Sequence, residues 1–258
     1  MGSNIFYLIL KAVKPLPVQT LWQLNWVSAD FKTWISLITQ RLAQGGGGRI
    51  VTPNPEIVMA AEANPDLKQI LSDAEYCLPD GVGIVWASRI LGNPIRQRLA
   101  GSDTLEALLP IYKGSIFLWG GRVGVADRAG QRISQRYSHV QIAGTASGYY
   151  EAAAETDIIN LIKQSQARLV LLGLGSPKQE LLLQRVYQAC PQAWIMTVGG
   201  MIDVLAGEVV RAPQLWRCLG MEWLYRGLRE PQRLKRWPAL LKFVLWVTRF
   251  KMKGSDAK

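Results

Sequence analysis

The sequence predicts an α/β fold, in which a doubly wound and mainly parallel sheet carries helices on both faces. The first indication is that segments typical of strands and of helices alternate from about residue 50 to residue 198. The second is that three of the expected strands end directly in glycine, as strands do when they lead into ligand-binding loops. Because 49% of the 258 residues are hydrophobic, the chain can also bury one large core.

The first 27 residues read as an irregular lead-in with one short strand over about 21–27. A helix over 31–42 follows, because its apolar residues have helical spacing and either Ser28 or Asp30 can cap it. Four consecutive glycines at 45–48 end this helix. They favour a flexible turn over a phosphate-binding loop, because no Lys-Ser or Lys-Thr pair follows them.

The stretch after these glycines contains two strands that end next to polar residues. A β-branched strand over 50–52 stops at a proline, and Asn54 then caps a helix that has proline at its first position. A second short helix begins after Asn64 in the same way. A short buried strand over 76–78 stops at another proline.

Asp80 follows the second of these strands on a Pro-Asp-Gly turn. Ligands of open α/β sheets bind outside the carboxyl ends of the strands, so we expect Thr52, Asn54 and Asp80 to share one site. The alternative is that Asp80 is an ordinary turn residue whose carboxylate bonds its own backbone.

The rest of the chain continues the alternation and completes a Rossmann-like, doubly wound sheet. Helices are expected over 83–91, 103–112, 125–137 and about 151–164, and the segment 173–180 leads into another helix. Strands are expected over 115–119, 140–143, 169–172 and 194–198.

Glycines at the ends of three strands predict a nucleotide-binding edge. A glycine allows backbone N–H groups to approach a phosphate or a ribose, and the start of the next helix favours negative charge. Lysine stands at residue 178, where the dinucleotide fingerprint requires glycine, and no Walker A motif is present. The sequence therefore indicates a nucleotide site that is neither a standard NAD site nor a P-loop. The glycines concerned are Gly120, Gly173, Gly175, Gly199 and Gly200.

The cysteines and the histidine exclude several chemistries. Cys77, Cys190 and Cys218 are odd in number and far apart, so neither a disulfide framework nor a zinc site is expected. The single histidine, His139, lies in a polar stretch where a surface position is typical. This argues against histidine-based triads and most zinc hydrolases.

The net charge of +11 is concentrated at the C-terminus. Residues 211–258 contain 12 Lys and Arg against three acidic residues, which accounts for +9. Anionic lipid, nucleic acid or phosphorylated substrates would each fit such a surface. The chain has no apolar run of the roughly 18 residues that a spanning helix needs, and no basic segment precedes its first apolar stretch. We therefore expect the catalytic part to be cytoplasmic.

Five segments carry a resemblance to a known family. They are VTPNPEIVMAA (51–61), LPDGVGIVWASRILG (78–92), RLAGSD (98–103), LGLGSPKQE (172–180) and VGGMIDVLAGEVVRAPQLWRCLGMEWLYRGLREPQRLKRW (198–237). In this order and spacing they resemble the WecG/TagA/CpsF family of glycosyltransferases over about residues 50–237. The resemblance implies an inverting transfer of N-acetylmannosamine, or its uronic acid, from a UDP-sugar to a polyprenyl-diphosphate-linked N-acetylglucosamine.

The resemblance also places the reaction in the synthesis of teichoic acids or related surface polysaccharides, on the cytoplasmic face of the cell membrane. It implies a metal-independent reaction without a cofactor. The sequence agrees, because it has no Asp-x-Asp pair to hold a divalent ion between diphosphate oxygens.

The resemblance implies a role for each of five polar residues. Asp80 would be the catalytic base, and Thr52 and Asn54 would position the donor sugar or the acceptor hydroxyl. Arg98 would grip the departing diphosphate, and Gln179 would hydrogen-bond the nucleotide or the sugar. For the four residues other than Asp80, the alternative is a helix cap or a loop hydrogen bond.

Residues 1–210 are expected to form the catalytic core, and residues 211–258 a basic, helical appendage that docks on an anionic membrane surface. Apolar residues from Trp237 to Val247 have the spacing of a helix that lies in the membrane interface. The alternative is a terminal helix that packs on its own domain or on a partner subunit.

The appendage also carries arginines at a spacing of three and four residues. On a continuous helix Arg226, Arg229 and Arg233 would form one basic stripe, although Pro231 can break that helix. We expect one or more of these arginines to reach the donor or acceptor diphosphate.

Two other functions compete with the glycosyltransferase. The glycine-ended strands permit a Rossmann-type oxidoreductase, which the missing fingerprint disfavours. The basic tail alone would fit a non-catalytic binder of nucleic acid or membrane. Its Trp and Leu residues have helical spacing, which favours a lipid surface over nucleic acid. The sequence leaves open the oxidation state of the donor sugar, the acceptor lipid and whether the protein forms a homo-oligomer.

Overall fold

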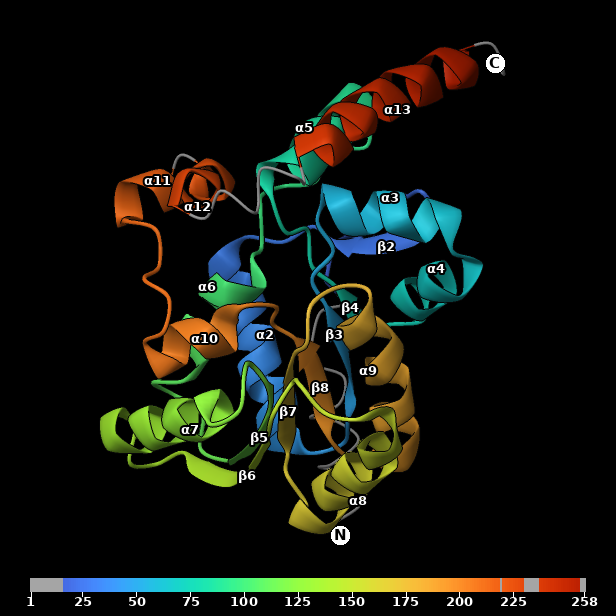
Figure 1. The fold of residues 1–258 in the computed structure, drawn as a ribbon. Helices are drawn as coiled ribbons and strands as arrows, with labels where there is room; N and C mark the ends of the chain where they lie inside the picture. The colour runs from blue at the N-terminus through green and yellow to red at the C-terminus, as the bar shows by residue number, and fades with distance from the viewer. Residues whose placement is uncertain (1–15, 219, 230–236, 256–258) are drawn as a thin grey trace, which may run out of the picture.

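The computed structural model describes residues 16–218, 220–229 and 237–255 (Figure 1). Within these residues the chain forms one eight-stranded sheet, whose strands are all parallel except the edge strand β1. The strands in spatial order are β1 (Val18–Leu21), β2 (Leu24–Val27), β4 (Tyr76–Cys77), β3 (Gly48–Val51), β8 (Trp194–Thr197), β7 (Leu169–Gly173), β5 (Ser115–Gly120) and β6 (Gln141–Ala146).

Helices cover both faces of the sheet, because successive strand residues point into two different apolar clusters. Leu171 and Leu172, for example, are neighbours on β7 and belong to opposite clusters. One cluster takes side chains from α3 (Pro55–Ala63), α4 (Pro65–Ser72), α5 (Val82–Ile90), α8 (Glu155–Ser165) and α9 (Lys178–Ala189). The other takes them from α2 (Phe31–Gln44), α6 (Gly101–Leu108), α7 (Val125–Arg136) and α10 (Met201–Ala206).

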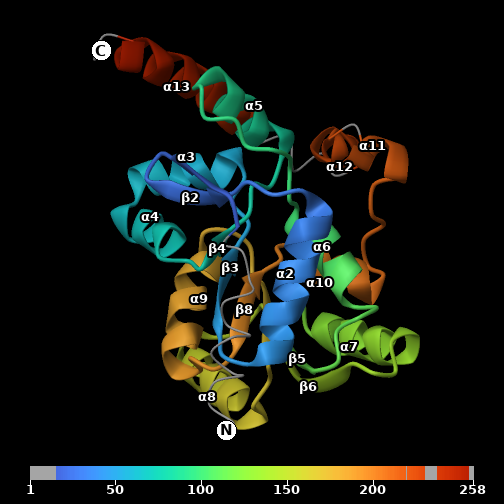
Figure 2. The ribbon, with the colours of Figure 1, turned by 180° about the vertical axis from the view of Figure 1, so that it is seen from behind.

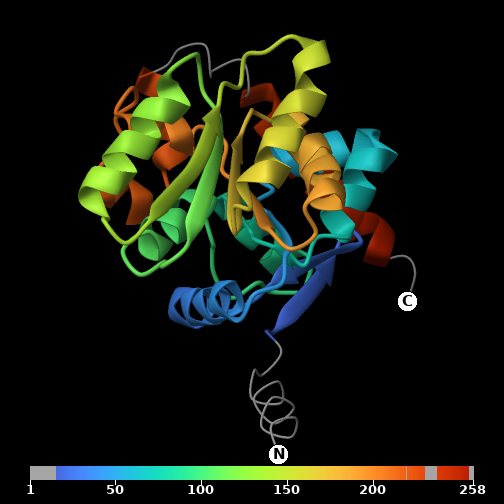
Figure 3. The same ribbon diagram turned by 90° about the horizontal axis from the view of Figure 1, so that it is seen from below.

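The two layers are plain in the rotated views. Figure 2 shows α2 in front of the sheet, and Figure 3 shows α7 on one side of the strands with α8 and α9 on the other. The predicted fold class is therefore confirmed. Element ends differ from the predicted ones by a few residues, and a short 3-10 turn, η1 (Ala152–Ala154), precedes α8.

The single strand predicted over 21–27 is wrong, because this segment forms a hairpin. Its two-residue turn consists of Trp22 and Gln23, with φ angles of 57° and 65°. Such a turn normally contains Asn or Gly, so its sequence gives no turn signal. Trp22 is 6% exposed, and its ring packs edge-on against Trp26 and Phe243, with centroid distances of 6.3 and 5.7 Å. Burial of this ring stabilises a conformation that the local sequence disfavours.

The seven parallel strands place the loops that follow them at one edge of the sheet, which we call the carboxyl edge. The chain runs from β3 outward to β4 and then crosses to β5 on the other side of β3. This reversal of strand order creates the crevice in which open α/β sheets bind ligands. The loops after β3, β8, β7 and β5 meet there.

The C-terminal part forms α11 (Gln214–Cys218), α12 (Glu222–Arg229) and α13 (Trp237–Ser255). These helices lie at the same end of the molecule as α3 and α5, which follow the carboxyl ends of β3 and β4 (Figure 1). Phe243 and Val247 of α13 are 1% and 0% exposed and belong to the apolar cluster that contains Trp22. The helix α13 is thus partly built into the core.

Candidate active site

Thr52 lies directly after β3 and is 8% exposed. Its hydroxyl donates a hydrogen bond of 3.2 Å to the carbonyl oxygen of Thr197, at the end of β8. The start of α6 passes so close that a Cβ atom at Gly101 would lie 2.8 Å from the Thr52 methyl carbon. The hydroxyl thus joins the ends of two adjacent strands in the crevice.

Asn54 begins α3. Its Oδ1 atom accepts a hydrogen bond of 3.0 Å from the backbone N–H of Ile57, and Pro55 occupies the first helical position. This is the predicted N-cap. Since the cap uses the side-chain oxygen, a contact with a ligand falls to the NH₂ group.

Asp80 is half-buried, in a loop that runs against the loop carrying Thr52 and Asn54. The backbone N–H of Asp80 donates to the carbonyl oxygen of Pro53 at 3.2 Å, and that of Leu78 donates to Val51 at 2.8 Å. The structure therefore brings together the three residues that the sequence assigned to one site.

Arg98 reaches the same place from a third loop. The backbone N–H of Leu99 donates to the carbonyl oxygen of Pro79 at 2.9 Å, which sets this loop beside Asp80. The Arg98 guanidinium donates through Nη2 to Oδ2 of Asp103 at 2.5 Å, and its side chain is 18% exposed. Asp103 thus orients the Arg98 guanidinium, in a loop that lies next to that of Asp80.

Gln179 is close to the crevice but does not face it. The side chain is 3% exposed, and its Oε1 atom accepts from the backbone N–H of Gly199 at 3.1 Å. Its Nε2 atom donates to Oε1 of Glu180 at 2.7 Å. Both ends of the amide are used within the protein, so the geometry gives no support to direct contact between Gln179 and a ligand.

Two of the predicted phosphate-binding glycines are required by packing. A Cβ atom at Gly120 would lie 2.5 Å from the carbonyl oxygen of Gly173, and one at Gly173 would lie 2.7 Å from that of Gly199. Neighbouring loops of the protein fill the space that was assigned to a phosphate. Protein contacts therefore explain these two glycines without a ligand.

The remaining three glycines differ from these two. Gly175 and Gly199 have φ angles of 76° and 52°, and a Cβ atom on either would meet no atom within 4 Å. Both flank open space at the carboxyl edge. Gly200 is the N-cap of α10 and has a φ of −76°. The N–H of Gly199 is already bonded to Gln179, so it is not a free donor for phosphate.

The sequence did not predict a group of charged residues beside Arg98. Arg211 has an 8% exposed side chain, which donates to Ser102 Oγ at 2.8 Å and pairs with Asp103 and Glu106 of α6. Burial, the largest single influence, lowers the pKa of Arg211, but the hydrogen bond to Glu106 and the surrounding carboxylates together raise it above the ordinary value. Arg211 therefore stays charged.

Local signals do not reveal this group, because Arg211 and Asp103 are 108 residues apart. The spacing of Asp103 and Glu106 does place both carboxylates on one face of α6. Their partner could not be named from sequence. Asp103 binds Arg98 through one oxygen and Arg211 through the other, so it links the crevice to the start of the appendage.

The predicted arginine stripe is described only in part. The helix α12 ends at Arg229, whose guanidinium lies over the ring of Tyr225 at 5.6 Å from its centroid. The side chain of Arg226 and the whole of Arg233 lie outside the described residues. Contact of these arginines with a diphosphate stays a prediction.

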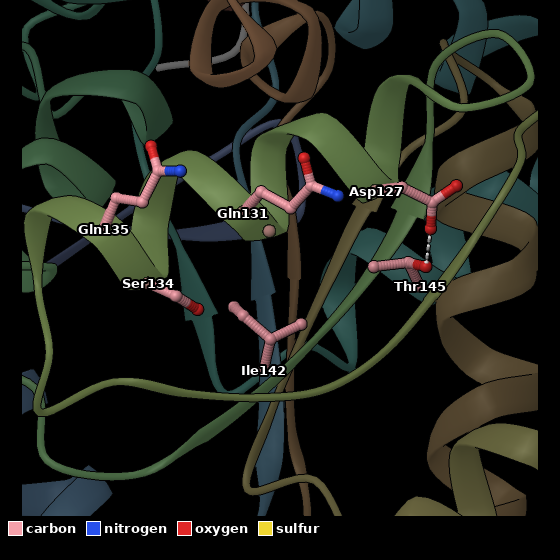
Figure 4. A pocket seen from close by; sticks show the side chains of 7 residues that line it. Asp127, Gln131, Ser134, Gln135, Ile142 and Thr145 are labelled. Carbon is pink, nitrogen blue, oxygen red and sulfur yellow. Dashed lines mark hydrogen bonds between the residues drawn. The ribbon is translucent and has the colours of Figure 1, made fainter.

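A hollow between α7 and β6 is separate from the crevice. Asp127 accepts a hydrogen bond from the Thr145 hydroxyl there, and Gln131, Ser134 and Ile142 line the rest (Figure 4). It lies along β6, an edge strand, and contains none of the predicted site residues.

The described residues were also searched for metal-binding groups and for membrane-spanning helices. No group of three or more His, Cys, Asp or Glu side chains is arranged so as to hold a metal ion in residues 16–218, 220–229 and 237–255. In the same part of the chain, none of the helices combines the length and the apolarity needed to span a bilayer.

Comparisons with known proteins agree on one family. The model of the glycosyl transferase WecG/TagA/CpsF family matches residues 19–257. A relative from Bacillus spizizenii is 34% identical over 226 residues, which are 86% of this chain and 87% of the relative. A relative from Bacillus subtilis is 32% identical over 236 residues, which are 90% of this chain and 91% of the relative. Each of these relatives is named N-acetylglucosaminyldiphosphoundecaprenol N-acetyl-beta-D-mannosaminyltransferase.

Proposed function

Because the chain belongs to the WecG/TagA/CpsF family of glycosyltransferases, we propose that it transfers N-acetylmannosamine from UDP to a polyprenyl-diphosphate-linked N-acetylglucosamine. The names of the two relatives support the transferred sugar and the acceptor. The UDP donor goes beyond these names, and it is supported by the Arg98 guanidinium and by the open space beside Gly175 at the carboxyl edge. The oxidoreductase and the nucleic-acid binder are not favoured.

The observation that carries the proposal is the convergence of three polar loops. Thr52, Asp80 and Arg98 come from segments that are joined by backbone hydrogen bonds from Asp80 to Pro53 and from Leu99 to Pro79. The loops that carry a hydroxyl, a carboxylate and a guanidinium therefore lie side by side at the switch point of the sheet. These are the groups that an inverting sugar transfer needs.

In the proposed reaction the acceptor hydroxyl attacks the anomeric carbon of the donor. The new C–O bond forms as the bond to the UDP oxygen breaks, and Asp80 takes the proton of the hydroxyl. Arg98 would stabilise the charge that develops on the departing diphosphate through the N–H groups that do not bind Asp103 among the described contacts. Thr52 and the NH₂ group of Asn54 would position the sugar.

We further propose that the protein works at the cytoplasmic surface of the membrane, because its lipid-linked acceptor stays there. On α13, residues 241, 244, 245, 248 and 252 share one helical face, on which Leu241 and Leu245 are 68% and 59% exposed. Lys242 and Arg249 flank this face on one side and Lys251 on the other. An exposed apolar face with basic flanks suits a helix lying in an anionic interface.

The helix α5 extends this surface toward the catalytic loop. It begins two residues after Asp80 and leaves Val82 and Trp86 about two-fifths exposed, at 41% and 39%. It also packs on α13, since a Cβ atom at Gly83 would lie 3.8 Å from the Phe243 ring. Docking through α13 and α5 would bring Asp80 close to the lipid-linked acceptor.

The decisive experiment compares Asp80→Asn with Asp127→Asn, a matched change in the hollow of Figure 4. Transfer of radiolabelled sugar from UDP-N-acetylmannosamine to a synthetic polyprenyl-diphosphate acceptor should fall by roughly 10²–10⁴ in Asp80→Asn, while UDP affinity is unchanged. Asp127→Asn should behave like the wild type.

The choice of asparagine also separates the two roles of Asp80. Asparagine supports turns as well as aspartate does, so a mere turn residue would tolerate the change. Full transfer by Asp80→Asn would overturn the assignment of the base. No transfer by the wild type, together with no rise in melting temperature on adding UDP, would overturn the function itself.

A further inference from the structure

Glu180 is a buried carboxylic acid that the proposed reaction does not use. It lies in the first turn of α9 and is 1% exposed. Its Oε1 atom accepts from Gln179, whereas its Oε2 atom has no hydrogen-bond partner among the described residues. A buried carboxyl with an unsatisfied oxygen is costly, so its presence calls for a compensating role.

The neighbouring amide shows what Glu180 achieves. Gln179 has to offer its oxygen to Gly199, because the Gly199 N–H is a donor and would repel the NH₂ group. The NH₂ group, which is equally buried, then needs an acceptor, and Glu180 supplies it at 2.7 Å. Glu180 thereby fixes which way the Gln179 amide points.

The oriented amide in turn holds the loop after β8. Gly199 has a left-handed φ of 52°, and the space beside its Cα atom is open. Two residues earlier, the carbonyl oxygen of Thr197 accepts the hydrogen bond from Thr52. A continuous series of contacts therefore leads from Glu180 through Gln179 and the β8 loop to Thr52.

We propose that Glu180 is a positioning residue, which sets the Gln179 amide and through it the loop that holds Thr52 in the donor site. The proposal rests on the proposed function only in calling this crevice the donor site. It also explains why Gln179 is buried at an edge where a ligand contact was expected.

The positioning role does not depend on the protonation state of Glu180. Burial raises the pKa of its carboxyl group, and the nearby polar groups of Gln179, Ser176 and its own backbone lower it to a smaller extent. The carbonyl oxygen of a protonated carboxyl also accepts from an amide. Positioning therefore requires a side-chain oxygen that extends far enough to accept from the Gln179 NH₂ group, and it does not require a charge.

Two conservative variants separate the position of this oxygen from the charge of the carboxyl group. Glu180→Gln keeps an oxygen at the same distance without a charge, and Glu180→Asp keeps the charge but withdraws the oxygen by one methylene. Leu182→Ala is the matched control, because Leu182 is 3% exposed on the same helix and takes no part in the hydrogen bonds of the Gln179 amide. It should lower stability without removing one of these hydrogen bonds.

The first measurement is hydrogen exchange of the full-length protein over residues 194–204, which does not depend on activity. Glu180→Asp should lose protection at Gly199 by about tenfold, the effect expected when a buried hydrogen bond is lost. Glu180→Gln should keep the wild-type protection. Leu182→Ala should keep it after correction for the lower global stability.

The second measurement is donor kcat/KM. It should fall by about tenfold in Glu180→Asp and stay within about threefold of the wild type in Glu180→Gln and Leu182→Ala. Wild-type protection and kinetics in Glu180→Asp, or equal losses in Glu180→Gln, would overturn the positioning role. If the wild type transfers no sugar, the proposed function fails, and the exchange data still decide whether Glu180 holds the loop.

Discussion

The C-terminal segment is attached to the core at two places that differ in kind. At its start, Arg211 forms ion pairs with Asp103 and Glu106 of α6. At its end, Phe243 and Val247 of α13 are buried among apolar side chains of the core. We call these contacts the charged anchor and the apolar anchor.

The two anchors should contribute differently to stability. The apolar anchor encloses Phe243 on an aromatic group, with ring centroids 5.7 Å from Trp22 and 6.1 Å from Trp246. In the charged anchor, the side chains of Asp103 and Glu106 stay 27% and 43% exposed, so water can replace Arg211 around them. Burial of apolar area stabilises a fold more than ion pairs that water can reach, so the apolar anchor should dominate.

The apolar anchor bears on the expected boundary between the core and the appendage at residue 211. The boundary marks the point at which the chain becomes basic, but the core does not end there, because α13 returns to it. Truncation after Ala212 would remove Phe243 and Val247 from the core. Point substitutions therefore test the role of the appendage better than truncation does, and its action as one functional unit stays a prediction.

The largest effect is expected for the apolar anchor. Phe243→Ala should lower the free energy of unfolding by about 3–5 kcal/mol, because it leaves a cavity against Trp22. Urea denaturation of the full-length protein measures this, with Leu245→Ala as a matched control on the exposed face of the same helix. A loss below about 1 kcal/mol would show that α13 is a peripheral element.

An intermediate effect is expected for the charged anchor. Arg211→Ala should cost about 1–3 kcal/mol, because charged hydrogen bonds to Asp103 and Ser102 are lost. Arg217→Ala is the control, since Arg217 is 26% exposed and its pair with Glu106 at 3.1 Å should contribute about 0–1 kcal/mol.

The same two variants show whether the charged anchor also matters for the site. Because Asp103 holds Arg98 as well, Arg211→Ala should raise the donor KM, and Arg217→Ala should leave it unchanged. Equal effects of the two variants on stability and on KM would mean that Arg211 has no special place in the group.

Local signals predicted the loops that carry Thr52, Asn54 and Asp80. Proline and asparagine at the strand ends locate the loops of Thr52, Asn54 and Asp80, because caps and breaks depend on adjacent residues. The order of parallel strands then brings the loops together. The alternation of strands and helices was readable for the same reason.

The parts that were missed depend on residues far apart in the chain. The Trp22–Gln23 turn depends on packing against Phe243, and Arg211 depends on Asp103. The burial of Gln179 depends on Gly199, 20 residues later. Contacts of this kind are set by tertiary packing, and no local sequence pattern predicts them.

The smallest effect on folding, and the one that tests membrane docking, is expected on the outer face of α13. Leu245 is 59% exposed there, so Leu245→Glu should change the free energy of unfolding by less than about 0.5 kcal/mol. At an anionic bilayer, the same change removes buried apolar surface and adds a like charge. Binding to liposomes that contain phosphatidylglycerol should therefore fall by about tenfold or more, as sedimentation would show.

Leu161→Glu is the control, because Leu161 is 52% exposed on α8, at the opposite end of the molecule from α13 (Figure 1). It adds the same charge and removes a similar exposed side chain, so it corrects for the change in net charge. If the two variants lose liposome binding equally, attraction of the whole basic protein explains the binding and α13 has no special role. If Leu245→Glu alone loses it, the two faces of α13 have separate tasks, because Phe243 and Val247 hold the helix to the core while its outer face meets the lipid.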